Sequence, residues 1–164
     1  MAEAVFVTHE NPLGREAPYY MARVDLAYAG LAGQVEQLWL NEVGDGTLQI
    51  ACIPFCAYGL AYRDIVRLDS VGVNVRELVR PSGHRALRSL LSIDMDADTL
   101  RQTRAALIQV ADKLAIAAEW HGDRYVAFDV PPTADPTQLV LTLDLLAGEG
   151  RAHHEWSDRH RFSP

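Results

Sequence analysis

The sequence has one lysine, Lys113, beside fourteen arginines, and only two cysteines, Cys52 and Cys56. No apolar run reaches the roughly 18 residues that a transmembrane helix needs, so we expect no membrane partner. The first residues, MAEAVFVTHENP, lack the basic segment and the long apolar segment of a signal peptide. Two cysteines four positions apart do not make the framework of a secreted, disulfide-rich domain. These absences predict a cytoplasmic protein with reduced thiols.

Several motifs that bind ligands or catalyse reactions are also missing. The chain has no G-x-G-x-x-G, no G-x4-G-K-[ST] and no G-x-S-x-G, which leaves nucleotide binding and α/β-hydrolase activity without support. His153 and His154 are adjacent, so a strand would point them to opposite faces, and no H-E-x-x-H occurs. The net charge of −7 opposes binding to nucleic acid. We therefore expect no metal, no cofactor and no nucleic-acid partner.

What is present is the composition of an ordinary globular protein, with 164 residues of which 49% are hydrophobic and 23% charged. This length suffices for one domain or two small lobes. Alternation of apolar and polar residues predicts a strand from Tyr20, and Val35–Val43 and Thr47–Ile53 read as a hairpin around Asp45-Gly46. Further short strands are predicted over residues 65–68, 73–79 and 84–93. Such a series of short antiparallel strands is typical of a small curled sheet or barrel.

The second half of the sequence has helical signals. A helix is predicted at about 97–111, with Asp96 as its N-cap residue. A second hairpin joins LAIAAEW to RYVAFDV through His121-Gly122-Asp123. The clearest helix is ADPTQLVLTLDLLAGEG, with Asp135 at the N-cap, Pro136 at the first helical position and Gly148 just past the end. A last strand is predicted at about 151–156.

From residue 84 the predicted order is strand, helix, strand, strand, helix, strand, which is the order of a ferredoxin-like fold. We therefore predict an α+β protein in which a small antiparallel β-barrel-like lobe, residues 18–83, packs on a ferredoxin-like βαββαβ lobe, residues 84–157. Residues 1–17 show no period and are predicted to form a flexible arm. Residues 158–164 are predicted to form a polar tail.

A set of short motifs resembles a known family. The motifs are "LW", "GDG", "IPF" followed by "YG", an acid before "IV", "SGH" with an arginine four residues after the histidine, and "VAFDVPP". Over about residues 35–157 they are similar to a bacterial, often actinobacterial, domain-of-unknown-function family. The resemblance implies a bacterial cytoplasmic protein but no established activity, cofactor or catalytic residue. The chain departs from the family at Arg63, where a glycine is usual, and at Cys56, where an aromatic or aliphatic residue is usual.

The two cysteines have the spacing C-x3-C, which is neither the zinc-ribbon spacing nor a redox motif. Cys52 shares a strand face with Leu48 and Ile50, which predicts a small core residue. Cys56 lies after Pro54, where the alternation ends, and is a candidate nucleophile. A nucleophilic thiol needs a base or a positive charge nearby, and no sequence neighbour supplies one.

A candidate site combines residues from two predicted strands. His84 and Arg88 share one strand face and offer two donors that can hold a carboxylate or phosphate. The structural alternative is a histidine that anchors a turn and an arginine paired with Glu77 or Asp64. Asp64 is expected either to fix a corner by accepting backbone N–H groups or to pair with His84 as acid and base. The nearby tyrosines Tyr58 and Tyr62 are the remaining candidate ligand-binding residues.

Two classes of function remain open. The first is a binding or accessory protein that holds a small ligand or a partner protein in a cleft between its two lobes. The second is a small cofactor-free enzyme acting on a small molecule, with Asp64 and His84 as acid and base, Cys56 as candidate nucleophile and Arg88 orienting an anion. The enzyme requires an enclosed pocket lined by these side chains, whereas a protein-binding function requires an exposed apolar patch or a free sheet edge.

Overall fold

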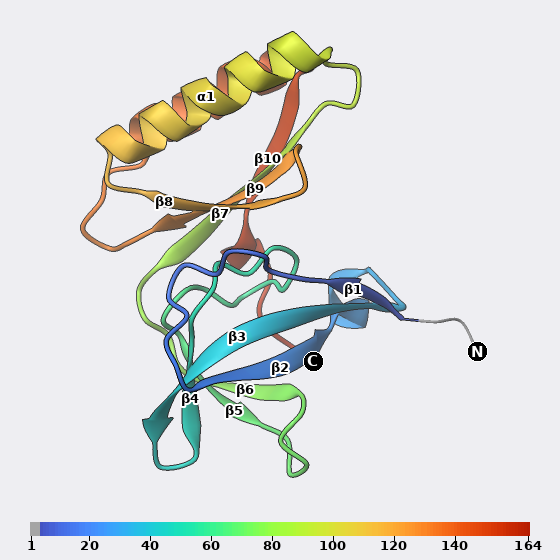
Figure 1. The fold of residues 1–164 in the computed structure, drawn as a ribbon, viewed down its shortest axis with the longest axis vertical. Helices are drawn as coiled ribbons and strands as arrows, with labels where there is room; N and C mark the ends of the chain where they lie inside the picture. The colour runs from blue at the N-terminus through green and yellow to red at the C-terminus, as the bar shows by residue number, and fades with distance from the viewer. Residues whose placement is uncertain (1–3) are drawn as a thin grey trace.

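The computed structural model describes residues 4–164, which form two β-sheets and two α-helices (Figure 1). The elements of the first half are β1 (Val5–Val7), β2 (Tyr19–Asp25), the 3-10 helix η1 (Leu26–Ala29), β3 (Gln34–Gly44), β4 (Thr47–Ile50), β5 (Ile65–Leu68) and β6 (Val75–Arg80). Those of the second half are β7 (Arg85–Leu91), α1 (Ala97–Lys113), β8 (Ala117–His121), β9 (Tyr125–Val130), α2 (Thr137–Gly148), β10 (Ala152–Trp156) and the 3-10 helix η2 (Ser157–Arg159).

The first sheet has the strand order β1-β3-β4-β5-β6, with β2 also paired to β3. All pairs are antiparallel except β1 with β3. The sheet curls until β2 approaches the turn before β6, where Arg23 and Asn74 form an isolated bridge. Within residues 4–164 neither sheet closes into a barrel, so a closed form of the predicted barrel-like lobe is not found.

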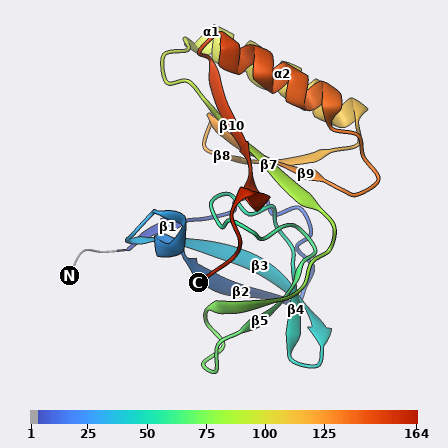
Figure 2. The ribbon, with the colours of Figure 1, turned by 180° about the vertical axis from the view of Figure 1, so that it is seen from behind.

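The second sheet is antiparallel with the order β10-β7-β9-β8, and both helices cover the same face of it (Figures 1 and 2). The predicted cap of α1 is confirmed, because the Asp96 carboxylate accepts the Thr99 N–H at 2.8 Å. The α2 helix begins one residue later than predicted, although the Asp135 carboxylate still accepts the Thr137 N–H at 3.0 Å. The mixed α+β class is confirmed.

The strand β7 belongs to two hydrophobic cores. Ala86 packs into the core of the first sheet, whereas Leu87 and Leu91 pack under the helices. This follows from the period of two in a strand, which sends alternate side chains to opposite faces. The face of the second sheet that the helices leave uncovered therefore packs on the first half of the molecule, with the segment 51–64 between the two sheets (Figure 1).

Both ends of the chain are more structured than the sequence predicts. Residues 1–3 lie outside the described part, but β1 adds to the edge of β3 and His9 is buried. At the other end, the segment after β10 returns to the first sheet (Figure 2). There the Phe162 ring packs against Tyr28 with 5.6 Å between ring centroids. The predicted arm and tail thus both contribute to packing, through contacts with segments distant in sequence.

Candidate functional site

The buried charged side chains of the molecule lie at the junction between the two sheets. Among residues 4–164, the buried charged side chains are His9, Glu36, Asp64, Arg88, Glu119 and Asp129. Each lies on an element that faces this junction: the N-terminal segment, β3, the segment 51–64, β7, β8 or β9. Because burying a charge is unfavourable unless it is paired and hydrogen-bonded, the partners of each side chain decide whether it is structural or available to a ligand.

His9, Glu36 and Glu119 form a closed group, which we call the His9 cluster. The His9 ring lies between the two carboxylates, with Nδ1 2.7 Å from Glu119 and Nε2 3.0 Å from Glu36. The same ring stacks on Phe55 with 4.3 Å between centroids and 9° between planes. Both ring nitrogens are therefore occupied by partners within the protein.

The His9 cluster also holds the backbone of the segment 51–64. The Glu36 carboxylate accepts three consecutive N–H groups, from Phe55 at 2.5 Å, Cys56 at 2.9 Å and Ala57 at 2.7 Å. Glu119 accepts the Ile53 N–H at 3.0 Å. These bonds satisfy backbone groups that would otherwise be buried without partners. The cluster is thus a structural support for the loop.

Protonation in the His9 cluster follows from these contacts. Burial alone would lower the pKa of His9, but its neighbours Cys52, Glu119 and Glu36 raise that pKa to about 12. Burial alone would raise the pKa of Glu36, and the hydrogen bond and charge of His9 outweigh it, so this pKa is lowered. The cluster therefore contains an imidazolium between two carboxylates at neutral pH.

The carbonyl of Phe55 is the second anchor of the loop. It accepts hydrogen bonds from the Arg88 guanidinium at 2.8 Å and the Tyr125 hydroxyl at 2.5 Å. Arg88 also lies 3.4 Å from Glu155, whose carboxylate accepts the Tyr58 hydroxyl at 2.5 Å. The predicted ligand-binding residues Arg88 and Tyr58 are therefore engaged with the protein itself, and Glu155, rather than Glu77 or Asp64, is the partner of Arg88.

The cysteines do not form a reactive pair. Cys52 is fully buried in the first core, as predicted, and Cys56 is partly buried beside Glu36. Burial and the nearby carboxylate raise the pKa of the Cys56 thiol to about 12. At neutral pH this residue is a thiol and not the thiolate that attacks a substrate. The geometry therefore disfavours the predicted role of Cys56 as a nucleophile.

His84 has a different environment from His9. Its Nδ1 lies 2.8 and 3.0 Å from the two carboxylate oxygens of Asp129, at the end of β9. The ring packs edge-on against Tyr62 with 5.6 Å between centroids. No hydrogen bond from residues 4–164 reaches its Nε2, and the side chain is 13% exposed. One nitrogen is thus held by a carboxylate while the other remains available.

Asp64 takes the structural role that was one of its two predicted alternatives. Its carboxylate accepts the N–H groups of Ala61 at 2.8 Å and Ser82 at 2.7 Å, which fixes the corner before β5 against the turn before β7. No hydrogen bond joins Asp64 to His84 in the described chain. Burial raises the pKa of Asp64 despite these bonds. The histidine is therefore paired with Asp129 and not with the predicted Asp64.

His84 and Asp64 nevertheless line one cavity of about 210 Å³, which we call the cleft. Its walls come from both halves of the molecule: the loop after Tyr58, β6, the turn before β7, and η2. The lining residues are Gly59, Leu60, Ala61, Asp64, Leu78, Pro81, Gly83, His84, Arg85, Ser157 and Asp158. Of the predicted site, the cleft brings together His84 and Asp64, with Tyr62 against the back of the imidazole.

A second cavity, of about 290 Å³, shares Pro81 and His84 with the cleft. We call it the cationic pocket, because Arg63 and Arg80 line it together with Gln49, Ile65 and Ser82. Neither guanidinium forms an ion pair or a hydrogen bond with residues 4–164. Arg63 has a φ of 66°, in the left-handed region that a residue with a side chain rarely adopts.

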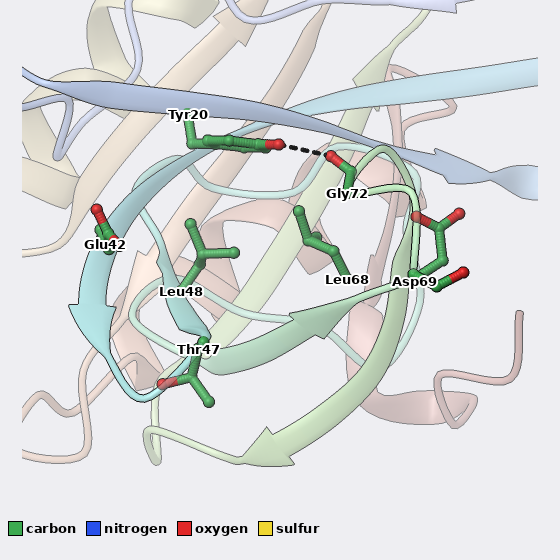
Figure 3. Close-up of a pocket in the computed structure, with 9 residues that line it drawn as sticks. Tyr20, Glu42, Thr47, Leu48, Leu68, Asp69 and Gly72 are labelled. Atoms are coloured by element: carbon green, nitrogen blue, oxygen red, sulfur yellow. Dashed lines mark hydrogen bonds between the residues drawn. The ribbon is translucent and has the colours of Figure 1, made fainter.

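A third cavity lies at the far end of the first sheet (Figure 3), and we call it the hairpin pocket. It measures about 310 Å³, with Leu48 and Leu68 at its centre and the Tyr20 hydroxyl donating to the Gly72 carbonyl at 2.7 Å across one side. The Asp69 carboxylate is engaged within its own turn, where it accepts the N–H of Val73 at 2.9 Å. All of its lining comes from the first half of the molecule.

Two kinds of feature, a cluster of metal ligands and a membrane-spanning helix, are not found among residues 4–164. No group of three or more His, Cys, Asp or Glu side chains within residues 4–164 has a geometry that would hold a metal ion. Neither α1 nor α2, the two helices of that same stretch, combines the length and the apolar character needed to cross a membrane.

Some of these residues could have been found from the sequence. Glu36 occupies the same face of the predicted strand as Leu38 and Leu40, so strict alternation already indicates a buried acid. Asp129 lies in the "DVPP" motif that carried the family resemblance. His9, by contrast, lies in a segment without any period, and only the three-dimensional structure brings it to β3 and β8.

Comparisons with known proteins find one family model and one similar solved structure. The sequence model described as "Domain of unknown function (DUF4265)" matches residues 36–154. No curated protein matches the chain. A crystal structure of a hypothetical protein from Neisseria gonorrhoeae is similar, with a TM-score of 0.64 and 17% sequence identity. The similarity covers 88% of this chain and 96% of that one, and it concerns the fold alone.

Proposed function

We propose a function for this chain, which belongs to the DUF4265 family of unknown function, from the geometry of its cleft, because the family description names no activity. The chain binds a small molecule in the cleft between its two halves. A single observation carries this proposal: the cleft is lined from both halves of the chain and presents an imidazole whose Nδ1 is held by Asp129 while Nε2 has no partner in residues 4–164.

Several features support ligand binding at this place. A concave, mostly apolar cleft with a few polar groups is the usual form of a small-molecule site. Its volume of about 210 Å³ fits a small metabolite or one end of a larger one, and no large cofactor. The backbone around it is fixed, because Asp64 joins the corner at Ala61 to the turn at Ser82. A fixed site binds with a smaller loss of conformational entropy.

The arrangement of the two halves of the chain supports a binding site between two lobes. The strand and helix order of residues 85–156 and the sheet order β10-β7-β9-β8 support a ferredoxin-like lobe, packed on a curled β lobe. In this view the cleft is a site between two lobes of a bacterial cytoplasmic binding or accessory protein. A partner protein is the alternative occupant of the same surface.

A second function, acid–base catalysis on a small molecule without a cofactor, is favoured by the His84–Asp129 pair. A carboxylate that accepts from Nδ1–H fixes the imidazole tautomer and leaves Nε2 as the base. Asp129 thus replaces Asp64 as the partner of the histidine, and Asp64 remains a second acid that lines the same cleft. Cys56 and Arg88 have no part in this reaction, because both are engaged at the junction.

The test is a protein-observed NMR screen of small carboxylates, phosphates, amines and neutral fragments. We expect the amide signals of Gly59, Leu60 and His84 to shift with at least one fragment, and His84→Ala to weaken the binding about tenfold. The control is His153→Ala, which removes an exposed imidazole from β10. The proposal fails if fragments shift only residues of the hairpin pocket, such as Leu48 and Leu68, or if no fragment binds.

A further inference from the structure

The cationic pocket is unusual for this chain because it gathers positive charge in a protein of net charge −7. Arg63 comes from the corner before β5, Arg80 from the end of β6, and His84 from the turn before β7. Two separate stretches of the chain thus bring three nitrogen-bearing side chains to one cavity.

The polar side chains at this pocket differ in whether they already have hydrogen-bond partners within the protein. The Ser82 hydroxyl donates to the Tyr62 carbonyl at 2.8 Å, and the carboxylate of Asp129 is paired with Nδ1 of His84. Within residues 4–164, in contrast, no partner is bonded to Nε2 of His84 or to the guanidinium groups of Arg63 and Arg80. The pocket therefore offers two unused guanidinium donors, those of Arg63 and Arg80, and no unused acid among its own lining residues.

The backbone at Arg63 is a second, independent observation. A φ of 66° is unfavourable for any residue with a Cβ atom, and glycine adopts it readily. Such strained residues cluster at functional sites, where the surrounding structure holds them in the unfavourable conformation. Here the strained position carries a guanidinium that lines the pocket, 5.5 Å from the centre of the Tyr62 ring.

We infer that the guanidinium groups of Arg63 and Arg80 bind the oxyanion group, a carboxylate or a phosphate, of the ligand whose remainder lies in the cleft. Planar guanidinium groups match carboxylate and phosphate oxygens in geometry and charge. His84 lines both cavities, so a ligand that bridges them would place its charged group beside the imidazole. The inference rests on the proposed function, because it names the charged part of that ligand.

The experiment uses the full chain and two simple probes, inorganic phosphate and acetate, at low ionic strength. We expect at least one probe to bind saturably in the millimolar range and to shift the amide signals of Arg63, Arg80 and His84. The probe that binds more tightly shows whether the site prefers a phosphate or a carboxylate. Arg63→Ala and Arg80→Ala should each weaken binding about tenfold, the usual effect of losing one charge-assisted contact.

The matched control is Arg76→Ala, which removes the same charge from the same strand, β6, but from outside the pocket. It should leave binding unchanged. Equal loss in all three variants would indicate attraction by net charge alone and would overturn the inference, as would no binding of either probe. If the probes bind as expected but no fragment shifts Gly59 or Leu60, the anion site stands and the proposed cleft function fails. If fragments bind in the cleft but neither probe binds, the cleft function stands and the anion site fails.

Discussion

Three histidines of the described chain are paired with carboxylates, and two of them, His9 and His84, lie at the junction between the sheets. These two differ in which ring nitrogens remain without a partner. His9 uses both ring nitrogens, on Glu36 and Glu119, and lines none of the three cavities described above. His84 uses one nitrogen, on Asp129, and lines two cavities. The same chemical pair is thus a support for a loop in one place and an open donor or acceptor in the other. Unused capacity for hydrogen bonds at the wall of a cavity, rather than residue type, distinguishes this candidate site from a structural cluster.

The largest effect should come from breaking the His9 cluster. Glu36→Ala leaves three N–H groups and the His9 imidazolium without their acceptor, so we expect a loss of about 3–5 kcal/mol in the free energy of unfolding. Urea denaturation measures it. The control is Glu42→Ala, at the exposed end of the same strand, which should change stability by less than about 0.5 kcal/mol. Similar values for the two variants would refute a structural role for Glu36.

Displacing the C-terminal segment from the loop should have the next largest effect. Gly59 has a φ of 73°, and a Cβ atom there would overlap the backbone of Phe162. Gly122 has a similar φ of 63° with open space around it. Gly122→Ala should therefore cost about 1–2 kcal/mol from backbone strain alone. Gly59→Ala should cost about 1–3 kcal/mol more, by displacing the segment. Equal thermal or urea stability of the two variants would show that the Phe162 contact contributes nothing.

Protonation of His9 gives a smaller, pH-dependent effect. Its pKa in the folded chain is raised to about 12, whereas an unfolded histidine has a pKa of about 6.5. Its contribution is fully present below that value and is lost as pH rises, because unfolding then releases a proton. Between pH 7 and about 8.5 we expect the free energy of unfolding to fall by about 1.4 kcal/mol per pH unit. His9→Gln should lack this slope in urea titrations at several pH values, and a variant that keeps it would contradict the assignment.

The smallest expected effect has the opposite sign. Arg63→Gly relieves the left-handed backbone and should raise stability by up to about 1 kcal/mol, while binding of phosphate or acetate is weakened about tenfold. A gain in stability with a loss of binding is the pattern expected of a strained functional residue. Arg63→Ala separates the two effects, because it removes the guanidinium and keeps the strain. Calorimetry with and without the anion measures both, and a stabilised glycine variant whose binding is not weakened would disprove the role of Arg63.

The sequence predicts the local parts of this structure well and the junction poorly. Capping at Asp96 and the Asp45-Gly46 hairpin depend on a few neighbouring residues, so short stretches of sequence are enough to predict them. The pairing of His84 with Asp129 depends on the register between β7 and β9, where Ala86 lies opposite Asp129. No pattern within a single strand determines that register.

His9 and Cys56 also depend on contacts with residues that are distant in the sequence. His9 reaches Glu119 across 110 positions of sequence, and its own segment has no periodic pattern that would mark it as buried. The reactivity of Cys56 is likewise invisible in its own segment, because the pKa of its thiol is raised by burial and by Glu36 from another strand. Residue types and spacing suggested chemistry for Cys56 and Arg88, and long-range contacts engage both of them in packing instead.

The most direct test follows both histidines in one titration. Imidazole 1H–15N spectra of the full chain are recorded at pH 8 while the strongest-binding fragment from the screen is added. We expect the Nε2 signal of His84 to move with a saturable dependence on ligand. His9 should remain doubly protonated and unchanged, because both of its nitrogens already have partners. A shift of His9 without a shift of His84 would contradict the assignment of one site as structural and the other as the ligand site.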